Sequence, residues 1–382
     1  MKLVHIADLH IGKRVNEFSM IDDQKHMLKE VLRIVDDVKP LGILMAGDIY
    51  DKSVPTGEAV QVLDDFLTEI VRRKVNLFIV SGNHDSAERL NFGSRIMQKN
   101  GVHIAGTFDG KLKHIVINDE FGPVNIYLLP FVKPAIVNAC YPNQDIQSYQ
   151  DAVKTVIETC QINEEERNIL VAHQFITSGS KEPERSDSET IAIGGLDNID
   201  VSVFEAFDYV ALGHLHGPQS IGRETIRYAG SPLKYSFSEA RQHKSVTVIE
   251  LRQKGSLEIQ TVPLKALRDM REIKGPLEEL LKAGRSEISH DYIRAIITDE
   301  GEVYDAIGQL RQIYPNIMRI DFENSRTRQD ENSQSSASGN VAQKTVFELF
   351  EEFYIKQNNI EMTEEQRRII QEVLEQVGGT AK

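Results

Sequence analysis

Short apolar runs alternate with amphipathic stretches through the first half of the chain, and this alternation limits the fold more than any other feature. Strand-like apolar runs cover residues 3–7, 41–46, 75–80, 124–129, 168–172 and 208–212. Helical spacing of apolar residues marks 20–38 and 149–159, and Thr56 stands at an N-cap position before a third helix. Strands that alternate with helices predict a layered α/β sheet.

The pattern changes after residue 262. Strands are expected at 267–273, 292–298 and 317–322, and helices at 275–283 and 303–313, which together make a small α+β unit over 263–323. Residues 324–343 are polar and Ser-rich, as is typical of a flexible linker. Residues 344–382 are aromatic and amphipathic and predict a helical tail. Residues 1–262 form the main domain in this division.

Composition excludes several classes of protein. A chain of 382 residues predicts two or three domains, and its formal net charge of -14 argues against coating nucleic acid by bulk electrostatic attraction. No apolar run approaches the roughly 20 residues of a membrane span, and the start has no signal-peptide pattern. Cys140 and Cys160 suggest no disulfide framework. A reducing cytoplasm is the expected location.

Carboxylate, imidazole and amide side chains recur where the predicted strands end. They are Asp8, His10, Asp48, Asn83, His84, Asp85, His173, His214 and His216. In open α/β sheets, ligands bind in the crevice at the carboxyl ends of the strands. Five strands that deliver such groups to one edge predict a single site there.

The kinds of side chain indicate a metal site. Asp8 and His10 are two residues apart, as are His214 and His216, and in an extended chain such pairs point to the same side. Oxygen and imidazole ligands without thiolates suit Mn²⁺ or Fe²⁺ better than structural Zn²⁺. Two ions need a bridging carboxylate, for which Asp48 is the natural candidate.

Each feature alone has a plainer explanation. Asp8 and Asp48 are also typical of turns at strand ends, the Gly82-Asn83 pair is a turn signal, and a lone His173 is more often a satisfied core residue. The His214-Leu-His216 pair lies between two glycines, which indicates close packing around it. Five independent coincidences at one edge are harder to accept than one metal site.

Five short motifs resemble the signature blocks of the calcineurin-like metallophosphoesterases. They are Asp8-x-His10, Gly47-Asp48, Gly82-Asn83-His84-Asp85, His173 and Gly213-His214-Leu215-His216. Longer segments at 5–13, 48–51, 211–219 and 228–246 resemble the SbcD family of bacterial exonuclease subunits, and the resemblance covers residues 1–250 well. It implies a metallophosphoesterase sandwich with a small capping domain over 263–323 and a helical tail.

The resemblance also assigns roles to the residues at matching positions. It implies one metal ion held by Asp8, His10, Asp48 and His216, and a second held by Asp48, Asn83, His173 and His214. The ions expected are Mn²⁺, with Fe²⁺ or Mg²⁺ as alternatives. His84 resembles the catalytic histidine that contacts the scissile phosphate and protonates the leaving oxygen, and Asp85 either orients His84 or braces the loop. Archaeal and eukaryotic relatives have a histidine where this chain has Asp51, so Asp51 is given no catalytic role.

The substrate and the partners follow from the same resemblance. It implies a double-strand exonuclease and single-strand endonuclease that acts on DNA ends and hairpins in repair, near the nucleoid, with an SbcC-type SMC-like ABC ATPase. A homodimer through helices near 57–73 and 86–99, within a heterotetramer, is expected. The tail residues expected to dock on the ATPase are Phe347, Leu349, Phe350, Phe353 and Tyr354. A small-substrate phosphoesterase and a non-catalytic ATPase scaffold are the alternatives.

Overall fold

A computed structural model of the chain describes residues 1–382 except 180, 190–196, 287–288, 302, 326, 328–346, 348–349, 352, 356–361 and 379–382. Contacts divide the chain into two units. The first contains 1–274, 278–296 and 305–320, and the second contains 275–277, 297–304 and 321–382. Leu349 and most of the predicted linker lie outside the described residues.

Two six-stranded sheets form the body of the first unit. The first sheet has the order β16 (Leu257–Pro263), β15 (Ser245–Leu251), β1 (Lys2–Ile6), β4 (Gly42–Ala46), β5 (Asn76–Val80) and β6 (Val102–Ala105). The strands from β1 to β6 in this order are parallel, and β15 and β16 pair antiparallel. The parallel strands therefore all end at the same edge of the sheet.

The second sheet is built in the same way. Its order is β13 (Gln219–Ile221), β14 (Arg223–Tyr228), β12 (Tyr209–Gly213), β9 (Arg167–His173), β8 (Gly122–Leu129) and β7 (Lys113–Asp119). The strands β14, β12, β9 and β8 are parallel, and the outer strands β13 and β7 pair antiparallel. The hairpin of β7 and β8 and the hairpin of β13 and β14 close the sheet on both sides.

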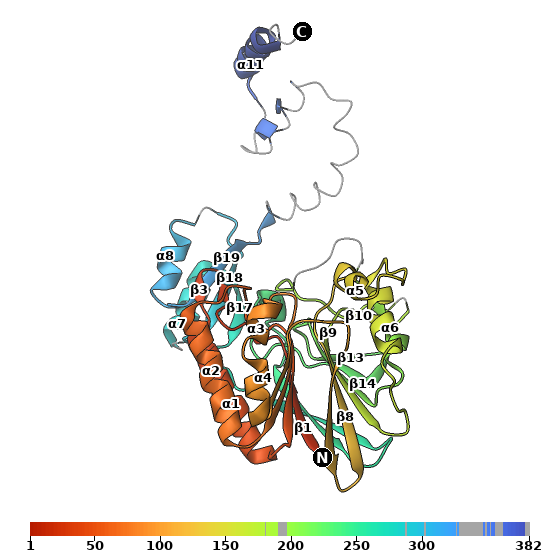
Figure 1. Cartoon of the computed structure of the whole chain (residues 1–382). Helices are drawn as coiled ribbons and strands as arrows, with labels where there is room; N and C mark the ends of the chain where they lie inside the picture. Colours follow the sequence, from red (N-terminus) through yellow and green to blue (C-terminus); the bar gives the residue numbers. More distant parts are fainter. Residues whose placement is uncertain are drawn as a thin grey trace. The chain divides into compact units, whose positions relative to one another are not determined.

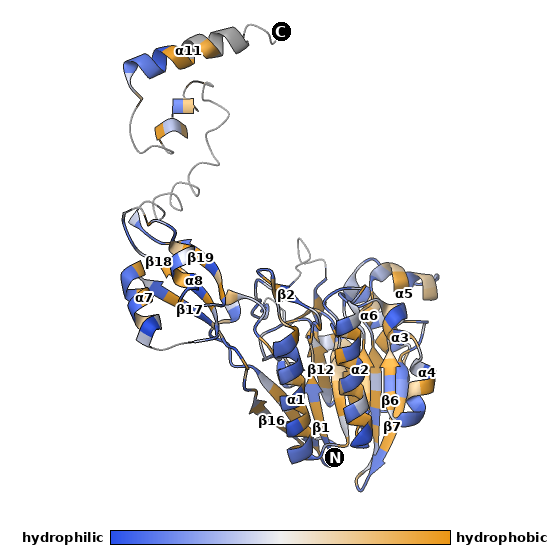
Figure 2. Cartoon of the chain, turned by 90° about the vertical axis from the view of Figure 1, so that its left-hand side faces the viewer, coloured by the Kyte–Doolittle hydropathy of each residue, from blue (hydrophilic) through white to orange (hydrophobic). Residues whose placement is uncertain are grey.

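The two sheets pack face to face, and helices cover their outer faces (Figure 1). Leu44, Phe78, Ile126 and Val171 belong to the apolar cluster between the sheets. Helices α1 (Ile21–Val38) and α2 (Gly57–Arg72) bury apolar residues against the first sheet, and α5 (Pro134–Cys140) and α6 (Tyr149–Glu158) bury theirs against the second. Figure 2 shows apolar residues along β1 and β12 and polar residues on α1. The predicted layered α/β fold is confirmed.

Local sequence explains where these helices begin. The Thr56 side chain accepts a hydrogen bond from Ala59 N at 3.2 Å and caps α2, as predicted. Ser148 and Asp151 form a reciprocal capping box at the start of α6. On α2 the side chain of Phe66 is buried with its neighbours, and full burial of such a side chain stabilises the fold by about 1.5–3 kcal/mol.

Further strands and α-helices lie in the described chain. They are β2 (Arg14–Val15), β3 (Phe18–Ser19), α3 (Ala87–Asn91), α4 (Ser94–Met97), β10 (Ile176–Thr177), β11 (Ile199–Asp200), β17 (Met270–Gly275), α7 (Leu277–Ser286), β18 (Tyr292–Ile297), α8 (Ala306–Arg311), β19 (Ile317–Phe322) and α11 (Glu364–Gly378). The sheet β17–β18–β19 with α7 and α8 provides the three strands and two helices expected in the α+β unit. The domain boundaries at 262 and 323 stay a prediction.

Candidate metal centre and active site

The carboxyl ends of five parallel strands converge on one cluster of polar side chains. β1, β4 and β5 lead to Asp8, Asp48 and Asn83, while β9 ends at His173 and β12 leads to His214. The cluster contains three groups of residues, and within each group the potential ligand atoms lie within 4.8 Å of one another. They are Asp8, His10 and His216; His10, Asp48 and His84; and Asp8, Asp48 and His173. The structure thus brings the residues predicted from the sequence into one place.

The backbone at this edge is left-handed. The φ angles are 54° at Asp8, 44° at His10, 50° at Asp48 and 104° at His214. Each non-glycine residue in such a conformation costs roughly 1–2 kcal/mol, and conformations of this kind concentrate at functional sites. The extended-chain argument for the two pairs spaced by two residues is therefore wrong for Asp8 and His10. Positive φ angles at Asp8 and His10, rather than an extended strand, accompany the placement of both side chains in the cluster.

Two glycines allow this close packing. A Cβ atom at Gly82 would lie 2.1 Å from Asp48 Oδ1, and one at Gly213 would lie 1.9 Å from the carbonyl oxygen of Ala46. Neither position can accept a larger residue without displacing the chain next to the cluster. The close packing expected around the His214-Leu-His216 segment is present at Gly213.

In the first half of the cluster, imidazole nitrogens and carboxylate oxygens face one another at short distances. His10 Nε2 lies 3.1 Å from His216 Nε2 and 3.5 Å from Asp48 Oδ2. Asp8 Oδ1 accepts a hydrogen bond from His214 N at 2.9 Å, whereas Asp8 Oδ2 has no hydrogen-bond partner in the described part of the chain. Burial raises the pKa of Asp8 to about 7. A cation among these atoms would satisfy the lone pairs that the protein leaves unmatched.

The second half shows the same convergence. His173 Nδ1 donates to the carbonyl oxygen of Ala46 at 2.8 Å, so in the neutral ring Nε2 is an acceptor. That atom lies 3.0 Å from Asn83 Oδ1 and 3.4 Å from Asp48 Oδ2. His214 Nδ1 lies 3.1 Å from the same Asn83 oxygen. Burial lowers the pKa of His173, but the Asp48 and Asp8 carboxylates outweigh it and raise that pKa to about 9. Without a metal this pKa leaves a proton on Nε2 that faces Asp48 and Asn83, and a divalent cation between these atoms would take the place of that proton.

Asp48 joins the two halves. Its Oδ2 atom faces both His10 and His173, and its Oδ1 atom accepts a hydrogen bond from the backbone N–H of His84 at 3.0 Å. Burial opposes ionisation, yet the histidines around Asp48 hold its pKa well below the usual value. A carboxylate between two sets of ligands is the arrangement that a bridging ligand needs.

His84 lies at the margin of the cluster and is half-buried. Its Nδ1 lies 2.9 Å from the carbonyl oxygen of Asp51, which can only accept, so Nδ1 is the donor. The Asp51 side chain pairs instead with Lys13 at 2.8 Å. The main chain of Asp51 thus orients the His84 ring.

Asp85 makes three hydrogen bonds with backbone N–H groups. It accepts from Ile49 at 3.1 Å, from Tyr50 at 2.9 Å and from Gly82 at 2.9 Å. Burial raises the pKa of Asp85 to about 6, although these hydrogen bonds favour the ionised form. Of the two roles considered for Asp85, the bracing of the loops after β4 and β5 is the one that these contacts support.

A network behind His216 was not predicted from the sequence. Ser188 Oγ lies 2.6 Å from His216 Nδ1 and donates to Glu239 at 2.5 Å, and Glu189 accepts from the backbone N–H of His216 at 2.7 Å. Lys244 donates to the His216 carbonyl at 2.8 Å and to Glu239 at 2.6 Å. Such partners fix the tautomer and direction of a ligand. Glu239 and Lys244 lie in 228–246, a segment noted only for its resemblance to the SbcD family, and nothing in the sequence pointed to Ser188 or Glu189.

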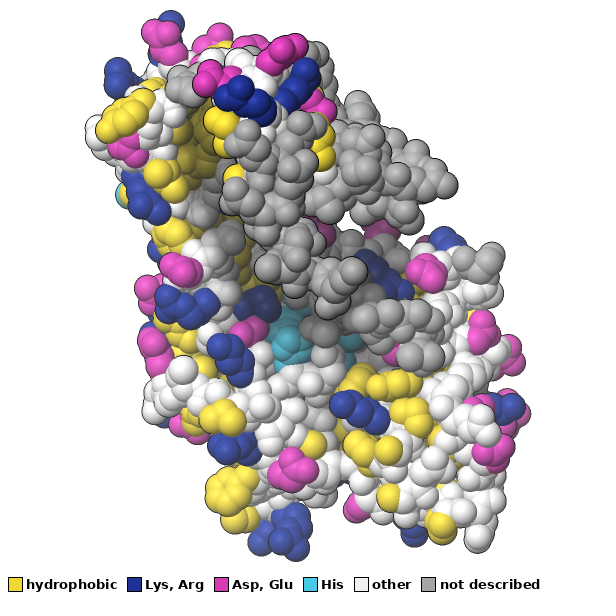
Figure 3. Space-filling model, turned by 90° about the horizontal axis from the view of Figure 1, so that it is seen from above, with side chains coloured by type: hydrophobic (Ala, Val, Ile, Leu, Met, Phe, Trp, Pro, Cys, Tyr) yellow, Lys and Arg dark blue, Asp and Glu magenta, His cyan; other side chains and the backbone are white. Residues whose placement is uncertain are grey.

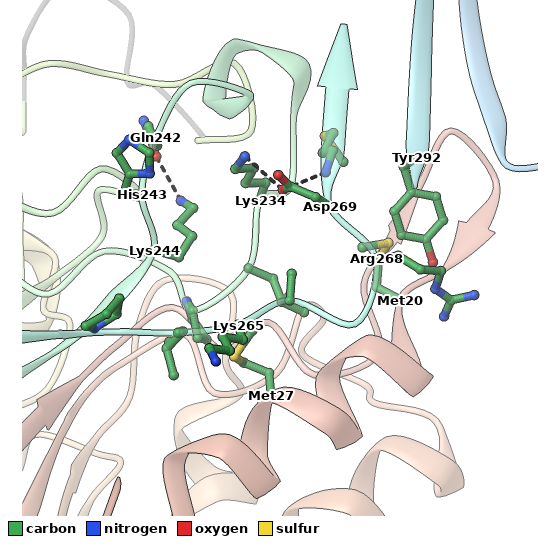
Figure 4. Close-up of a pocket in the computed structure, with 16 residues that line it drawn as sticks. Met20, Met27, Lys234, Gln242, His243, Lys244, Lys265, Arg268, Asp269 and Tyr292 are labelled. Atoms are coloured by element: carbon green, nitrogen blue, oxygen red, sulfur yellow. Dashed lines mark hydrogen bonds and ion pairs between the residues drawn. The ribbon is translucent and has the colours of Figure 1, made fainter. Parts of the chain in front are cut away.

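Histidine side chains reach the surface on the face of the molecule seen in Figure 3, with Lys and Arg side chains on the same face. A cavity of about 320 Å³ is lined in part by Lys234, His243, Lys265 and Arg268. Lys244 also lines it and connects it to the support of His216 (Figure 4). This basic cavity was not predictable from the sequence, because its residues come from segments far apart in the chain.

The tail residues belong to the second unit. Phe347, Phe350, Phe353 and Tyr354 are among the described residues, and Leu349 is not. The rings of Phe350 and Phe353 are 6.4 Å apart, and Phe353 is 57% exposed. Arg367 of α11 pairs with Glu351 at 2.6 Å, so the described parts of the tail contact each other.

Comparison with known proteins places the chain in a family. The model of the calcineurin-like phosphoesterase family matches residues 1–218, and a C-terminal domain model of SbcD type, described as the type 5 capsule protein repressor C-terminal domain, matches 266–358. The chain is 35% identical over 325 residues to the D subunit of the SbcCD nuclease of Staphylococcus epidermidis, and the match covers 84% of this chain and 85% of the relative. This chain belongs to the SbcD family. The S. saprophyticus protein of the same name is 33% identical over 84% of each chain.

Membership confirms the resemblance seen in the sequence and the expectation of a metal-dependent phosphodiesterase. A solved dimetal phosphatase from Danio rerio overlaps 68% of this chain and 95% of its own, with a TM-score of 0.41 and 11% identity. In the described part of the chain, no helix has the length and apolar character required to cross a membrane. The roles of the individual site residues stay predictions.

Proposed function

We propose that the chain is a Mn²⁺-dependent DNA nuclease that hydrolyses phosphodiester bonds at DNA ends and hairpins, as the catalytic partner of an SbcC-type ATPase. One observation supports it above the others: ligand atoms of Asp8, His10, Asp48, His84, His173 and His216 form three groups within 4.8 Å, and the buried atoms Asp8 Oδ2 and His10 Nδ1 have no hydrogen-bond partner in the described part of the chain. The two staphylococcal relatives are named as D subunits of the SbcCD nuclease, and these names support the proposed nuclease activity and the proposed complex. A cytoplasmic location near the nucleoid follows from that substrate.

The chemistry of the site follows from charge. When bound, two divalent cations would neutralise the phosphate and would make a water molecule acidic enough to attack it at neutral pH. Asp8, His10, Asp48 and His216 would hold one ion, and Asp48, Asn83, His173 and His214 would hold the other. His84, oriented by the carbonyl of Asp51, protonates the departing 3′-oxygen, a contribution of roughly 10²–10⁴-fold in rate. Asp85 keeps the loops that carry Asp48 and His84 together.

The basic residues around the cavity support the proposal that the substrate is a polyanion. His243 and Lys265 are exposed at its wall, whereas Arg268 pairs with Asp23 and Lys234 pairs with Asp269. A chain with a net charge of -14 needs such local positive sites to approach DNA. Contacts with the phosphate backbone at Lys265 would add affinity without sequence preference.

The test compares substrates under one set of conditions. The purified chain is incubated with linear duplex DNA, hairpin DNA or p-nitrophenyl phosphate, with Mn²⁺ and with or without the ATPase. We expect Mn²⁺-dependent cleavage of the DNA substrates, and loss of that cleavage in Asp48→Ala. Hydrolysis of the small ester alone would instead assign a small-substrate phosphoesterase. Activity in none of these assays, with an intact ATPase complex, would assign a scaffold.

A further inference from the structure

Gln24 of α1 is buried next to the loop that carries Asp8 and His10. Its Oε1 accepts from the backbone N–H of Gly12 at 2.9 Å. Its Nε2 donates to the carbonyl oxygen of His10 at 2.7 Å and to Tyr235 Oη at 3.1 Å. One side chain therefore satisfies backbone groups on both sides of the turn that presents His10.

Tyr235 holds the same loop from the other side. Its hydroxyl donates to the carbonyl oxygen of Leu9 at 2.5 Å, and its ring meets the rings of His10 and His216 edge to face, with centroids 5.7 Å and 5.8 Å away. Gln24 and Tyr235 together thus bind backbone groups of three residues within one short loop. We call this pair the Gln24–Tyr235 clamp.

The loop needs such a support because its backbone is unfavourable. Asp8, His10 and Gly12 all have positive φ, with 54°, 44° and 93°. A free chain would leave these conformations, and the two side chains would then point apart. The Gln24–Tyr235 clamp binds the carbonyls of Leu9 and His10, which are the groups that would turn if the loop relaxed.

We propose that Gln24, with Tyr235, is a positioning element for metal binding that holds the 8–12 loop in the left-handed form in which Asp8 and His10 face one ion. The inference rests on the proposed metal site and adds to it residues that touch neither metal nor substrate. The clamp binds backbone carbonyls rather than ligand atoms, so it fixes the direction of Asp8 and His10 without occupying any group that a metal ion needs.

Asp23, the neighbour of Gln24 on α1, provides a matched control. It is buried as well, but it faces away from the loop: it accepts from Arg268 Nε at 3.0 Å and from the Tyr292 hydroxyl at 2.7 Å. Figure 4 shows Arg268 and Tyr292 close to Met20, at the beginning of α1. Asp23→Asn therefore disturbs the same turn of α1 without touching the metal loop.

The experiment measures Mn²⁺ affinity by calorimetric titration of the full chain, with Gln24→Met, Tyr235→Phe and Asp23→Asn beside the wild type. We expect at least a tenfold weaker affinity for one of the two ions in Gln24→Met, a smaller loss in Tyr235→Phe, and the wild-type value in Asp23→Asn. The Mn²⁺ concentration for half-maximal cleavage should rise in parallel, while the rate at saturating Mn²⁺ recovers to within a few-fold.

The outcomes separate the hypotheses. Thermal unfolding of the metal-free chains identifies a variant that fails to fold, and Tyr235→Phe, which keeps the ring, then carries the test. Lower thermal stability with unchanged Mn²⁺ affinity in both clamp variants would overturn the positioning role and leave a structural one. Wild-type chain that binds no Mn²⁺ at all would overturn the proposed function instead, so the two failures are distinguishable.

Discussion

His84 is held by a backbone carbonyl and by the carboxylate of Asp48. Its Nδ1 donates to a main-chain carbonyl and its backbone N–H donates to Asp48, while it lies at the less buried margin of the cluster. We expect His84→Ala to keep near-normal Mn²⁺ binding and to lose about two or more orders of magnitude in cleavage rate, because an acid rather than a ligand is removed. Single-turnover cleavage and calorimetric titration on the same samples measure both quantities.

The competing hypothesis is that His84 is itself a metal ligand, because its ligand atom lies within 4.8 Å of those of His10 and Asp48. If His84→Ala loses one equivalent of Mn²⁺, His84 is a ligand and the acid must be sought elsewhere. His214→Ala is the matched comparison, since it removes a proposed ligand from the same cluster. It should lose metal and activity together.

His5 lies between the two sheets and makes stability depend on pH. Its Nδ1 lies 3.0 Å from Tyr209 Oη and its Nε2 lies 3.1 Å from the carbonyl oxygen of Leu212. Burial lowers the pKa of His5 to about 3, against 6.5 for an exposed histidine. The unfolded chain therefore binds a proton that the folded chain does not, and stability falls as the pH decreases from 6.5 towards 3.

The size of this effect can be measured with His5→Gln, which keeps hydrogen-bonding groups but does not titrate. Between about pH 6.5 and about pH 5 the wild type should lose roughly 1.5 kcal/mol more unfolding free energy than the variant, because only the unfolded state gains the proton. Urea denaturation of the metal-free chains at both pH values provides the comparison. Equal losses in the two chains would mean that His5 has the same pKa in the folded and unfolded states.

At the scale of residues, the sequence predicted which side chains meet but not how the chain turns to bring them together. Asp8, Asp48 and His173 follow apolar runs, so their common edge was predictable. The left-handed φ of Asp8 and His10 was not, because local preferences disfavour it and tertiary contacts impose it. Ser188, with its contact to His216, lies in a loop without periodicity and could not be predicted.

At the scale of elements, the segment of α3 and α4 exposes large apolar side chains, which is unusual for a surface that contacts only water. Phe92 is 83% exposed and Ile96 is 74% exposed, within the region expected to form a homodimer. We expect Ile96→Asp to shift the chain from dimer to monomer at micromolar concentrations, because a charge would be buried in the interface. Sedimentation velocity across a concentration series measures the state.

Val116 on β7 is the control for this experiment. It is 49% exposed and belongs to the edge hairpin of the second sheet rather than to the helices that are predicted to form the dimer. Val116→Asp should leave the oligomeric state unchanged. A wild type that sediments as a monomer at tens of micromolar would refute the dimer itself.

The regular elements were predictable where burial dictates the pattern. α1, α2 and α6 begin and end within a few residues of their predicted ranges, and Thr56 caps α2, because an apolar face and a cap are both local signals. The short β2–β3 hairpin and helix α5 were missed, since two-residue strands and a seven-residue helix carry too few apolar positions to show a period. The strands β6, β7 and β13–β16 were not predicted either. Strand order came only from the structure.

At the scale of the whole molecule, the described chain separates into two units, and the tail belongs to the second. Within it, Gln366 Nε2 donates to Tyr354 Oη at 3.0 Å, and Arg367 pairs with Glu351. The side chains of Phe353, Ile369 and Val373 are exposed. An amphipathic helical segment of this kind is suited to a groove on a partner.

We expect a chain that ends at Thr327 to keep Mn²⁺-dependent cleavage of open DNA ends and to lose co-purification with the ATPase. This end point retains β19 and the contacts of Asn324 with Asp299, so the α+β unit should stay folded. Phe353→Glu in the full chain is the matched variant: it places a charge on the exposed apolar surface and should weaken ATPase binding at least tenfold in calorimetric titration. An unchanged affinity in both chains would move the ATPase interface to residues before 327, where the phosphoesterase sandwich and the α+β unit are the remaining surfaces.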